Sequence, residues 1–136
     1  MGLVRFSVSL KDVLLANFDE HIKEKGYPTR SKAISNLIRE ALIKEEWKGD
    51  KNVAGAITLI YNHHRRELVN KLIEIQHDFY KTIISSQHTH LDHDNCLEVV
   101  VVKGEPEEIK KLANRLKSTK GVKHSALTMA TTGEEI

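Results

Sequence analysis

The first 47 residues of the chain predict one strand followed by two helices, and this combination constrains the fold more than any other feature. In residues 4–10, Phe6, Val8 and Leu10 alternate with polar side chains, which is typical of a half-buried strand. Apolar residues at helical spacing follow in two segments, which Gly26 and Pro28 separate. About fifty residues with a single strand cannot bury these faces alone, and a lone strand leaves its backbone groups unpaired. We therefore expect two copies of the chain to pair their strands and interlock their helices.

A polar segment without periodicity, residues 48–52, separates this part from a second set of elements. The patterns that follow predict a strand over 56–61, a helix across 68–83, strands over 85–91 and 96–103, a helix from 105 to about 120, and a strand over 122–130. This βαββαβ order is that of a ferredoxin-like domain. The expected fold class is α+β, with a βαα domain over residues 1–48 and a βαββαβ domain over residues 53–136.

Composition limits which binding partners and which cellular compartment we expect for the protein. The 136 residues carry a formal net charge of +2, too small to indicate nucleic-acid binding alone, so any DNA-binding surface must be a local patch or be doubled by oligomerisation. A single cysteine excludes an intrachain disulfide and fits a reducing cytosol. The N-terminus lacks the apolar core of a signal peptide, and no apolar stretch is long enough to span a membrane. We expect a cytoplasmic protein without a membrane partner.

A thiolate and several imidazoles are concentrated near the middle of the second domain. His88 and His90 are two residues apart, so both project from one face of the predicted strand. If residues 91–95 form the hairpin turn, His90 lies opposite Cys96 and His88 lies opposite Glu98. This register would bring two imidazoles and one thiolate together, with the Glu98 carboxylate placed to orient a ligand histidine. Such donors suit a transition metal better than calcium or magnesium.

The fourth ligand and the metal stay open at this point. His77, in the predicted helix, could supply the fourth ligand within the chain or across an interface, and His93 in the predicted turn competes with it. A tetragonal four-coordinate site would favour Ni(II) or Cu(II), whereas a tetrahedral site would favour zinc.

Short motifs along nearly the whole chain carry a family resemblance. They are Gly26-Tyr27 before Arg30-Ser31, Gln76-His77, His88 and His90 with Asp94–Glu98, Lys103-Gly104, and Gly121-Val122 with His124. In these motifs the chain resembles the nickel-responsive transcriptional regulators of the NikR family. The resemblance implies a ribbon-helix-helix DNA-binding domain joined to an ACT-like regulatory and tetramerisation domain. It also implies a homotetramer, a dimer of dimers, that binds double-stranded DNA.

The resemblance further implies a nickel site with one Ni(II) per subunit. In that site, His88, His90 and Cys96 of one subunit and His77 of a neighbouring subunit hold the ion in a square-planar arrangement. The supporting hydrogen bonds would come from Tyr61, His63 and Glu98.

For DNA, the resemblance implies that Arg5, Ser7 and Ser9 read base edges from a two-stranded ribbon in the major groove. The start of the second helix offers backbone donors and positive charge to phosphates, through Thr29, Arg30, Ser31 and Lys32. Where some family members have acidic residues for a second cation, this chain has Lys32 and Asn36.

We therefore expect a regulator that binds an inverted-repeat operator when Ni(II) occupies the histidine–cysteine site, and that controls nickel-related genes. A metal storage or delivery protein is an alternative, which the strand–helix–helix domain disfavours. A ribbon-helix-helix regulator that senses an amino acid is another, which the histidine–cysteine cluster disfavours. We do not expect an enzyme: Cys96 near a histidine could mimic a nucleophile and its base, but the sequence has no oxyanion-hole motif.

Overall fold

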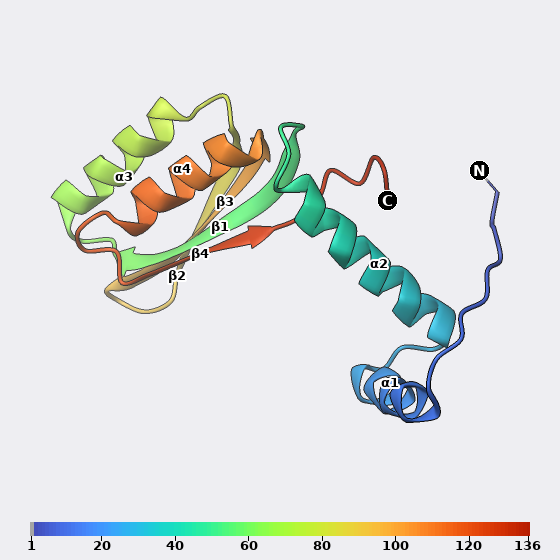
Figure 1. Cartoon of the computed structure of the whole chain (residues 1–136). Coiled ribbons are helices and arrows are strands. Elements are labelled where there is room, and N and C mark those ends of the chain that lie inside the picture. Colours follow the sequence, from blue (N-terminus) through green and yellow to red (C-terminus); the bar gives the residue numbers. More distant parts are fainter. Residues whose placement is uncertain (1) are drawn as a thin grey trace. The chain divides into compact units, whose positions relative to one another are not determined.

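The computed structural model describes residues 2–136, which form two compact units (Figure 1). The first unit ends at Glu40 and the second covers residues 41–136, so the division falls within a helix. The proposed domain boundary in the polar segment 48–52 stays a prediction. No helix in the described part of the chain is long and apolar enough to cross a membrane.

Two helices make up the regular structure of the first unit, α1 (Asp12–Lys25) and α2 (Arg30–Glu46), of which α2 continues into the second unit. Gly26 ends α1 in the left-handed conformation, with φ 75°, where glycine carries no steric penalty. The Thr29 hydroxyl accepts a hydrogen bond from the Lys32 N–H at 3.1 Å, so Thr29 caps the start of α2.

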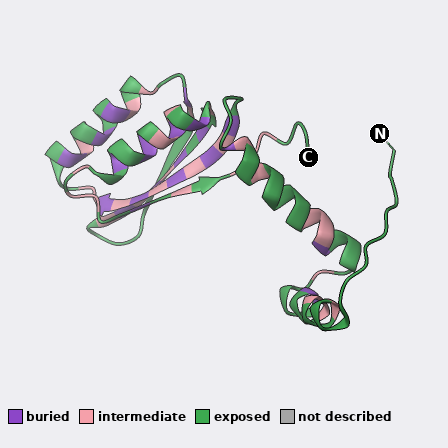
Figure 2. Cartoon of the chain, viewed as in Figure 1, coloured by how far each residue is buried: buried purple, intermediate pink, exposed green. Residues whose placement is uncertain are grey.

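The strand expected over residues 4–10 is not formed in the single chain. Residues 2–11 are exposed and carry no regular secondary structure (Figure 2), and the exposed fractions of Phe6 and Val8 are 70% and 60%. The physical reason is that a strand needs a neighbouring strand for its N–H and C=O groups, and one copy of the chain supplies none here. A strand over residues 4–10 in paired chains stays a prediction.

The second unit is a four-stranded antiparallel sheet with two helices on one face (Figure 1). Its strands lie in the order β2-β3-β1-β4, which is the sheet of the expected βαββαβ arrangement. The elements are β1 (Val53–Asn62), α3 (Arg66–Asp78), β2 (Ile83–His90), β3 (Asn95–Gly104), α4 (Pro106–Lys117) and β4 (His124–Met129).

The helix expected across 68–83 is shorter than the sequence pattern indicated. It ends at Asp78, and Ile83 already belongs to β2, where it pairs with Val102. The apolar spacing continues past the helix because Phe79 and Ile83 pack against the core from non-helical positions. A tight turn, with the Thr82 N–H donating to the Phe79 carbonyl at 2.9 Å, redirects the chain into the sheet.

The core of the second unit lies between the sheet and its two helices. Residues of β1 alternate between buried and half-buried (Figure 2), and Ile57 and Leu59 are fully buried. Trp47, which follows α2, is also part of this core, and its indole N–H donates to the Ala130 carbonyl at 2.8 Å. The last turns of α2 therefore fold with the sheet domain.

Candidate metal centre

The hairpin formed by β2 and β3 sets the geometry of the candidate centre. His90 pairs with Cys96 and His88 pairs with Glu98, which confirms the expected register. Cys96 and Glu98 are buried under the helices, with exposed fractions of 1% each. Because β2 is an edge strand, the two histidines on the same face remain exposed. The hairpin therefore places both imidazoles at the open margin of the buried core.

A well-bonded turn fixes this register. The Asp92 carboxylate accepts hydrogen bonds from the backbone N–H of Asp94 at 2.9 Å and of Asn95 at 2.7 Å, and from the Asn95 side chain. The bonds from Asn95 and Asp94 hold the pKa of Asp92 below its usual range. The His63 N–H also donates to the Asp94 carbonyl at 3.1 Å, which ties the turn to the loop after β1. A one-residue slip of the hairpin would break these contacts.

Among the four expected nickel ligands, only His88 and Cys96 contact each other within one chain. The Cys96 sulfur lies 3.8 Å from Nδ1 of His88, and the Tyr61 hydroxyl lies 3.3 Å from the same nitrogen. A buried thiol beside an imidazole nitrogen is a soft donor set that suits a transition-metal ion.

A buried hydrogen-bond network stands behind these two ligands. The Tyr61 hydroxyl donates to the Glu98 carboxylate at 2.7 Å, and the Gln76 amide donates to its other oxygen at 2.9 Å. That second oxygen is also 3.5 Å from Nε2 of His88. Burial, reinforced by the hydrogen bond to Glu98 and its negative charge, raises the pKa of Tyr61 above its usual range. Tyr61 therefore stays protonated and donates to Glu98 at neutral pH.

Sequence reasoning missed the part played by Gln76. It stood in a family motif next to His77, but nothing in the sequence indicated that it would bond to a carboxylate on β3. The available signal was its position in α3, next to Ile75, which is buried against the sheet.

His90 does not contact Cys96 through a hydrogen bond in the described chain. Its ring instead stacks on that of His63, with centroids 4.3 Å apart and planes 6° from parallel. Nε2 of His63 is buried and has no hydrogen-bond partner among the described residues. A buried nitrogen without a hydrogen-bond partner lowers the stability of the fold by about 1–3 kcal/mol. The unpaired His63 ring therefore fits a site that a further group completes.

The two candidates for the fourth ligand lie elsewhere. His77 is exposed on α3, with its ring centroid 6.4 Å from that of Tyr80, and no hydrogen bond within residues 2–136 joins it to His88, His90 or Cys96. His93 is exposed in the hairpin turn, where Nδ1 lies 3.1 Å from the Asp94 carboxylate. In the single chain, His77 thus lies on the surface of α3 and His93 contacts Asp94, and the choice between them as fourth ligand stays a prediction.

The residues expected to contact DNA lie in the first unit. Arg5, Ser7 and Ser9 are exposed in the segment without regular structure. Arg30 makes a two-pronged ion pair with Asp19, at 2.9 and 2.8 Å, and the bonds from Arg30 lower the pKa of that carboxyl. Ser31 and Lys32 are exposed at the start of α2. Of the expected phosphate-contacting side chains, Arg30 is therefore already engaged, whereas Lys32 is free of ion pairs among the described residues.

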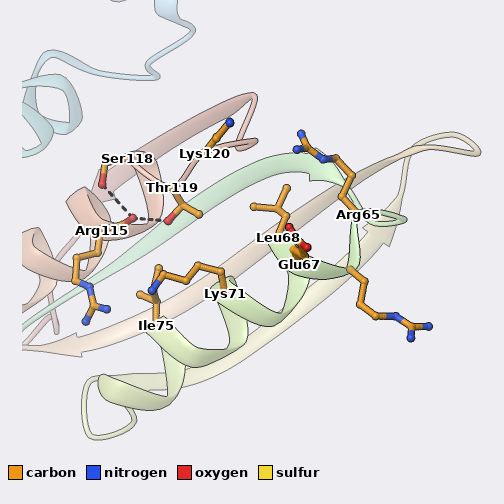
Figure 3. A pocket seen from close by; sticks show the side chains of 10 residues that line it. Arg65, Glu67, Leu68, Lys71, Ile75, Arg115, Ser118, Thr119 and Lys120 are labelled. Carbon is orange, nitrogen blue, oxygen red and sulfur yellow. Dashed lines mark hydrogen bonds between the residues drawn. The ribbon is translucent and has the colours of Figure 1, made fainter.

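A basic cleft of about 760 Å³ lies between α3 and the end of α4 (Figure 3). Its basic lining residues are Arg65, Arg66, Lys71, Arg115 and Lys120. Two hydroxyls that line it, those of Ser118 and Thr119, donate to the Arg115 carbonyl at 3.3 and 2.7 Å (Figure 3). None of the expected metal ligands lines this cleft.

Comparison with known proteins assigns the second unit. The family described as the NikR C-terminal nickel-binding domain matches residues 54–130. A relative from Syntrophus aciditrophicus is 57% identical over 132 residues, covering 97% of this chain and 96% of the relative. A relative from Pyrococcus furiosus is 52% identical, covering 100% of this chain and 99% of the relative. Both bear the name of a nickel-responsive regulator.

Among solved structures, an uncharacterized protein from Thermotoga maritima matches with a TM-score of 0.52. The match covers 57% of this chain and 96% of that protein at 16% sequence identity, so it shows a common fold and nothing more.

These matches confirm the expected resemblance and the expected role in transcription regulation. They also confirm that the family binds nickel. Its members are regulators and not enzymes. Of the three metals left open by the sequence, nickel, copper and zinc, the family is one that binds nickel. The chain belongs to the nickel-responsive regulators that carry the NikR C-terminal nickel-binding domain.

Proposed function

We propose that this regulator binds one Ni(II) per subunit and, when loaded, binds an inverted-repeat DNA operator and controls nickel-related genes. The observation that carries the proposal is the β2–β3 register, which sets His88 and His90 opposite Glu98 and Cys96. Nickel would be held by His88, His90 and Cys96 of one subunit and by His77 of a neighbour. The bound ion would supply a positively charged centre that accepts electron pairs from ligands of two subunits.

The residues behind the ligands hold the site in place. Tyr61 and Gln76 each donate to Glu98, and Glu98 lies within 3.5 Å of His88, so the network limits the rotation of that imidazole. His63 stacks on His90 and restrains the second imidazole. Tyr61, His63 and Glu98 are therefore proposed to support the ligands without binding the ion.

The ligand position of His77 supports assembly into a homotetramer. His77 is exposed on α3, while Gln76, the preceding residue, turns inward to Glu98. A ligand that points outward next to an incomplete site fits a neighbour that has the same incomplete site. Two-subunit sites of this kind would join two DNA-binding dimers into a dimer of dimers.

For the DNA-binding part, residues 1–48, we propose a ribbon-helix-helix dimer. The exposed apolar side chains of residues 4–10 and of both helices support pairing with a second copy, because such faces are otherwise left in water. Pairing through residues 4–10 would turn Phe6 and Val8 inward and present Arg5, Ser7 and Ser9 to the major groove. The DNA phosphates would be approached by Thr29, Arg30, Ser31 and Lys32. Arg30 would then either leave Asp19 for a phosphate or contact both.

Nickel titration followed by absorption spectroscopy tests the ligand set. We expect one tightly bound nickel per chain, a thiolate-to-nickel charge-transfer band and diamagnetic nickel. Affinity should fall as the pH drops through the range in which histidine and cysteine become protonated, because only the deprotonated groups bind metal. Cys96→Ser should remove the band, and His124→Ala, an exposed histidine on β4, should keep it. Tight binding without the band in the unaltered chain would contradict the ligand set.

A further inference from the structure

We propose that the basic cleft between α3 and the end of α4 binds a small oligophosphate anion. Its volume, about 760 Å³, lies in the range of roughly 300–1,000 Å³ that is usual for small-molecule sites. Five of its lining residues are basic and one, Glu67, is acidic. A concave surface with this excess of positive charge attracts anions and repels metal cations. None of the proposed nickel ligands or DNA contacts lines the cleft, so the inference does not depend on the proposed function.

Most of the positive charges in the cleft lack an acidic partner. Lys71 approaches Glu74 only to 3.9 Å, and both side chains are exposed, so water weakens their attraction. Arg115 is paired more closely, with Asp78 at 3.2 Å. The basic lining residues that form no ion pair within residues 2–136 are Arg65, Arg66 and Lys120. An anion with several negative charges would supply the missing partners.

The loop after α4 restricts the position of one arginine of the cleft. Gly121 in this loop has φ 102°, and a Cβ on it would lie 3.1 Å from Nη1 of Arg65 and 3.0 Å from Leu68. Glycine therefore lets the loop pass close to the guanidinium group. Figure 3 shows Arg65 at the start of α3 and Lys120 on that loop, both at the same end of the cleft. A guanidinium group held in this way can bind phosphate oxygens through two parallel N–H donors.

The shape of the cleft favours a small anion over a DNA duplex. Lys71 lines it from α3 and Arg115 lines it from α4, so a bound anion would meet positive charge from both helices (Figure 3). Packed helix axes are typically about 8–10 Å apart, whereas the major groove of DNA alone is about 12 Å wide. A duplex is therefore too broad to enter, and a chain of two or three phosphates is narrow enough. Leu68 and Ile75 add apolar surface, so the phosphates can be those of a free oligophosphate or of a nucleotide.

Calorimetric titration of the full chain tests the site, with inorganic triphosphate and ATP as separate probes. The chain is kept free of metal, because nickel would itself bind these anions. We expect one triphosphate per chain, with an affinity that falls as the salt concentration rises. ATP should compete with triphosphate for the same site. Tighter binding of ATP would show that the nucleoside contacts the apolar residues, and equal affinities would show that the phosphates alone are recognised; both results support the site.

Two substitutions and a matched control locate the binding. Lys71→Ala and Lys120→Ala should each lower the affinity for triphosphate about tenfold, the loss expected for one hydrogen bond to a charged group. The control is Lys111→Ala, because Lys111 is an exposed lysine of α4 that pairs with Glu108 at 3.4 Å and does not line the cleft. Its affinity for triphosphate should be unchanged. In NMR spectra, the amide resonance of Gly121 should shift as triphosphate is added.

Three results would contradict the oligophosphate site. The first is that neither probe binds. The second is an equal loss of affinity in Lys71→Ala and Lys111→Ala, which would indicate attraction to the overall charge of the chain. The third is that Lys71→Ala and Lys120→Ala weaken binding to duplex DNA alone, which would make the cleft part of a DNA-binding surface. The thiolate-to-nickel band and operator binding report separately on the proposed function.

Discussion

Glu98 is the residue on which the side chains behind the candidate nickel ligands converge. It is 1% exposed, and both of its carboxylate oxygens accept hydrogen bonds, one from Tyr61 and one from Gln76. A buried carboxylate is tolerated only when it is bonded in this way. The same carboxylate approaches His88, so the residue links the stability of the domain to the position of a ligand.

Tyr61→Phe should destabilise the domain. The change removes the donor to one Glu98 oxygen and leaves a buried acceptor with a missing partner, a loss of about 1–3 kcal/mol in the free energy of unfolding. Urea unfolding of the metal-free chain measures it. Tyr80→Phe is the control, because Tyr80 is exposed. A Tyr61→Phe chain as stable as the unaltered chain would show that the network does not contribute.

The same substitution has a consequence at alkaline pH. Because the pKa of Tyr61 is raised in the folded chain, folding favours its protonated form. The associated stability is fully present below the pKa of an unfolded tyrosine, about 10, and is lost as the pH rises above it. The alkaline decline should therefore be smaller in Tyr61→Phe.

At the scale of elements, the β2–β3 hairpin could be predicted from the sequence, whereas the strand expected over residues 4–10 does not form in the single chain. The register followed from loop length and side-chain alternation, and Asp92 then supplied the bonds that fix it. The end of α3 was misplaced because Phe79 and Ile83 continue a helical spacing while packing from other conformations. The stacking of His63 on His90 and the bond from Gln76 to Glu98 depend on side-chain positions across the sheet, which no local pattern contains.

The ribbon and the start of α2 should contribute differently to DNA binding. Arg5→Ala should cost about 1–3 kcal/mol per contact and relax specificity at the base it reads. Lys32→Ala should weaken binding to all sequences and flatten its salt dependence, because a phosphate contact carries no sequence information. Titrations on specific and scrambled duplexes at two salt concentrations separate these effects. Equal losses on both duplexes for Arg5→Ala would refute its base-reading role.

At the scale of the whole molecule, a single chain can complete neither the proposed DNA-binding domain nor the proposed nickel site. Its first 40 residues expose apolar side chains on the segment before α1 and on both helices, and only two of the proposed nickel ligands, His88 and Cys96, contact each other. In the proposed assembly, further copies of the chain would meet both deficits. Assembly therefore belongs to the proposed mechanism, because DNA and nickel would each bind a surface that two subunits share.

His77→Ala and His93→Ala distinguish a shared nickel site from a single-chain site. His77→Ala should abolish tight nickel binding, because it removes the ligand that the neighbour supplies. His93→Ala should leave the thiolate-to-nickel band and the tight affinity nearly unchanged, because His93 lies in the turn with Asp94. Competition with a chelator of known affinity measures both. The reverse pattern would establish a site built within one chain.

The most direct test of nickel-controlled DNA binding compares the affinity of the full chain for an operator with and without nickel. The operator is first selected from random duplexes with the nickel-loaded protein. A coupling free energy typical of linked sites predicts affinity about 5–150-fold higher with nickel, and nickel must then bind tighter to the DNA complex by the same factor. Cys96→Ser should abolish this increase. Equal operator affinity with and without nickel, at full occupancy of the thiolate site, would contradict the proposed function.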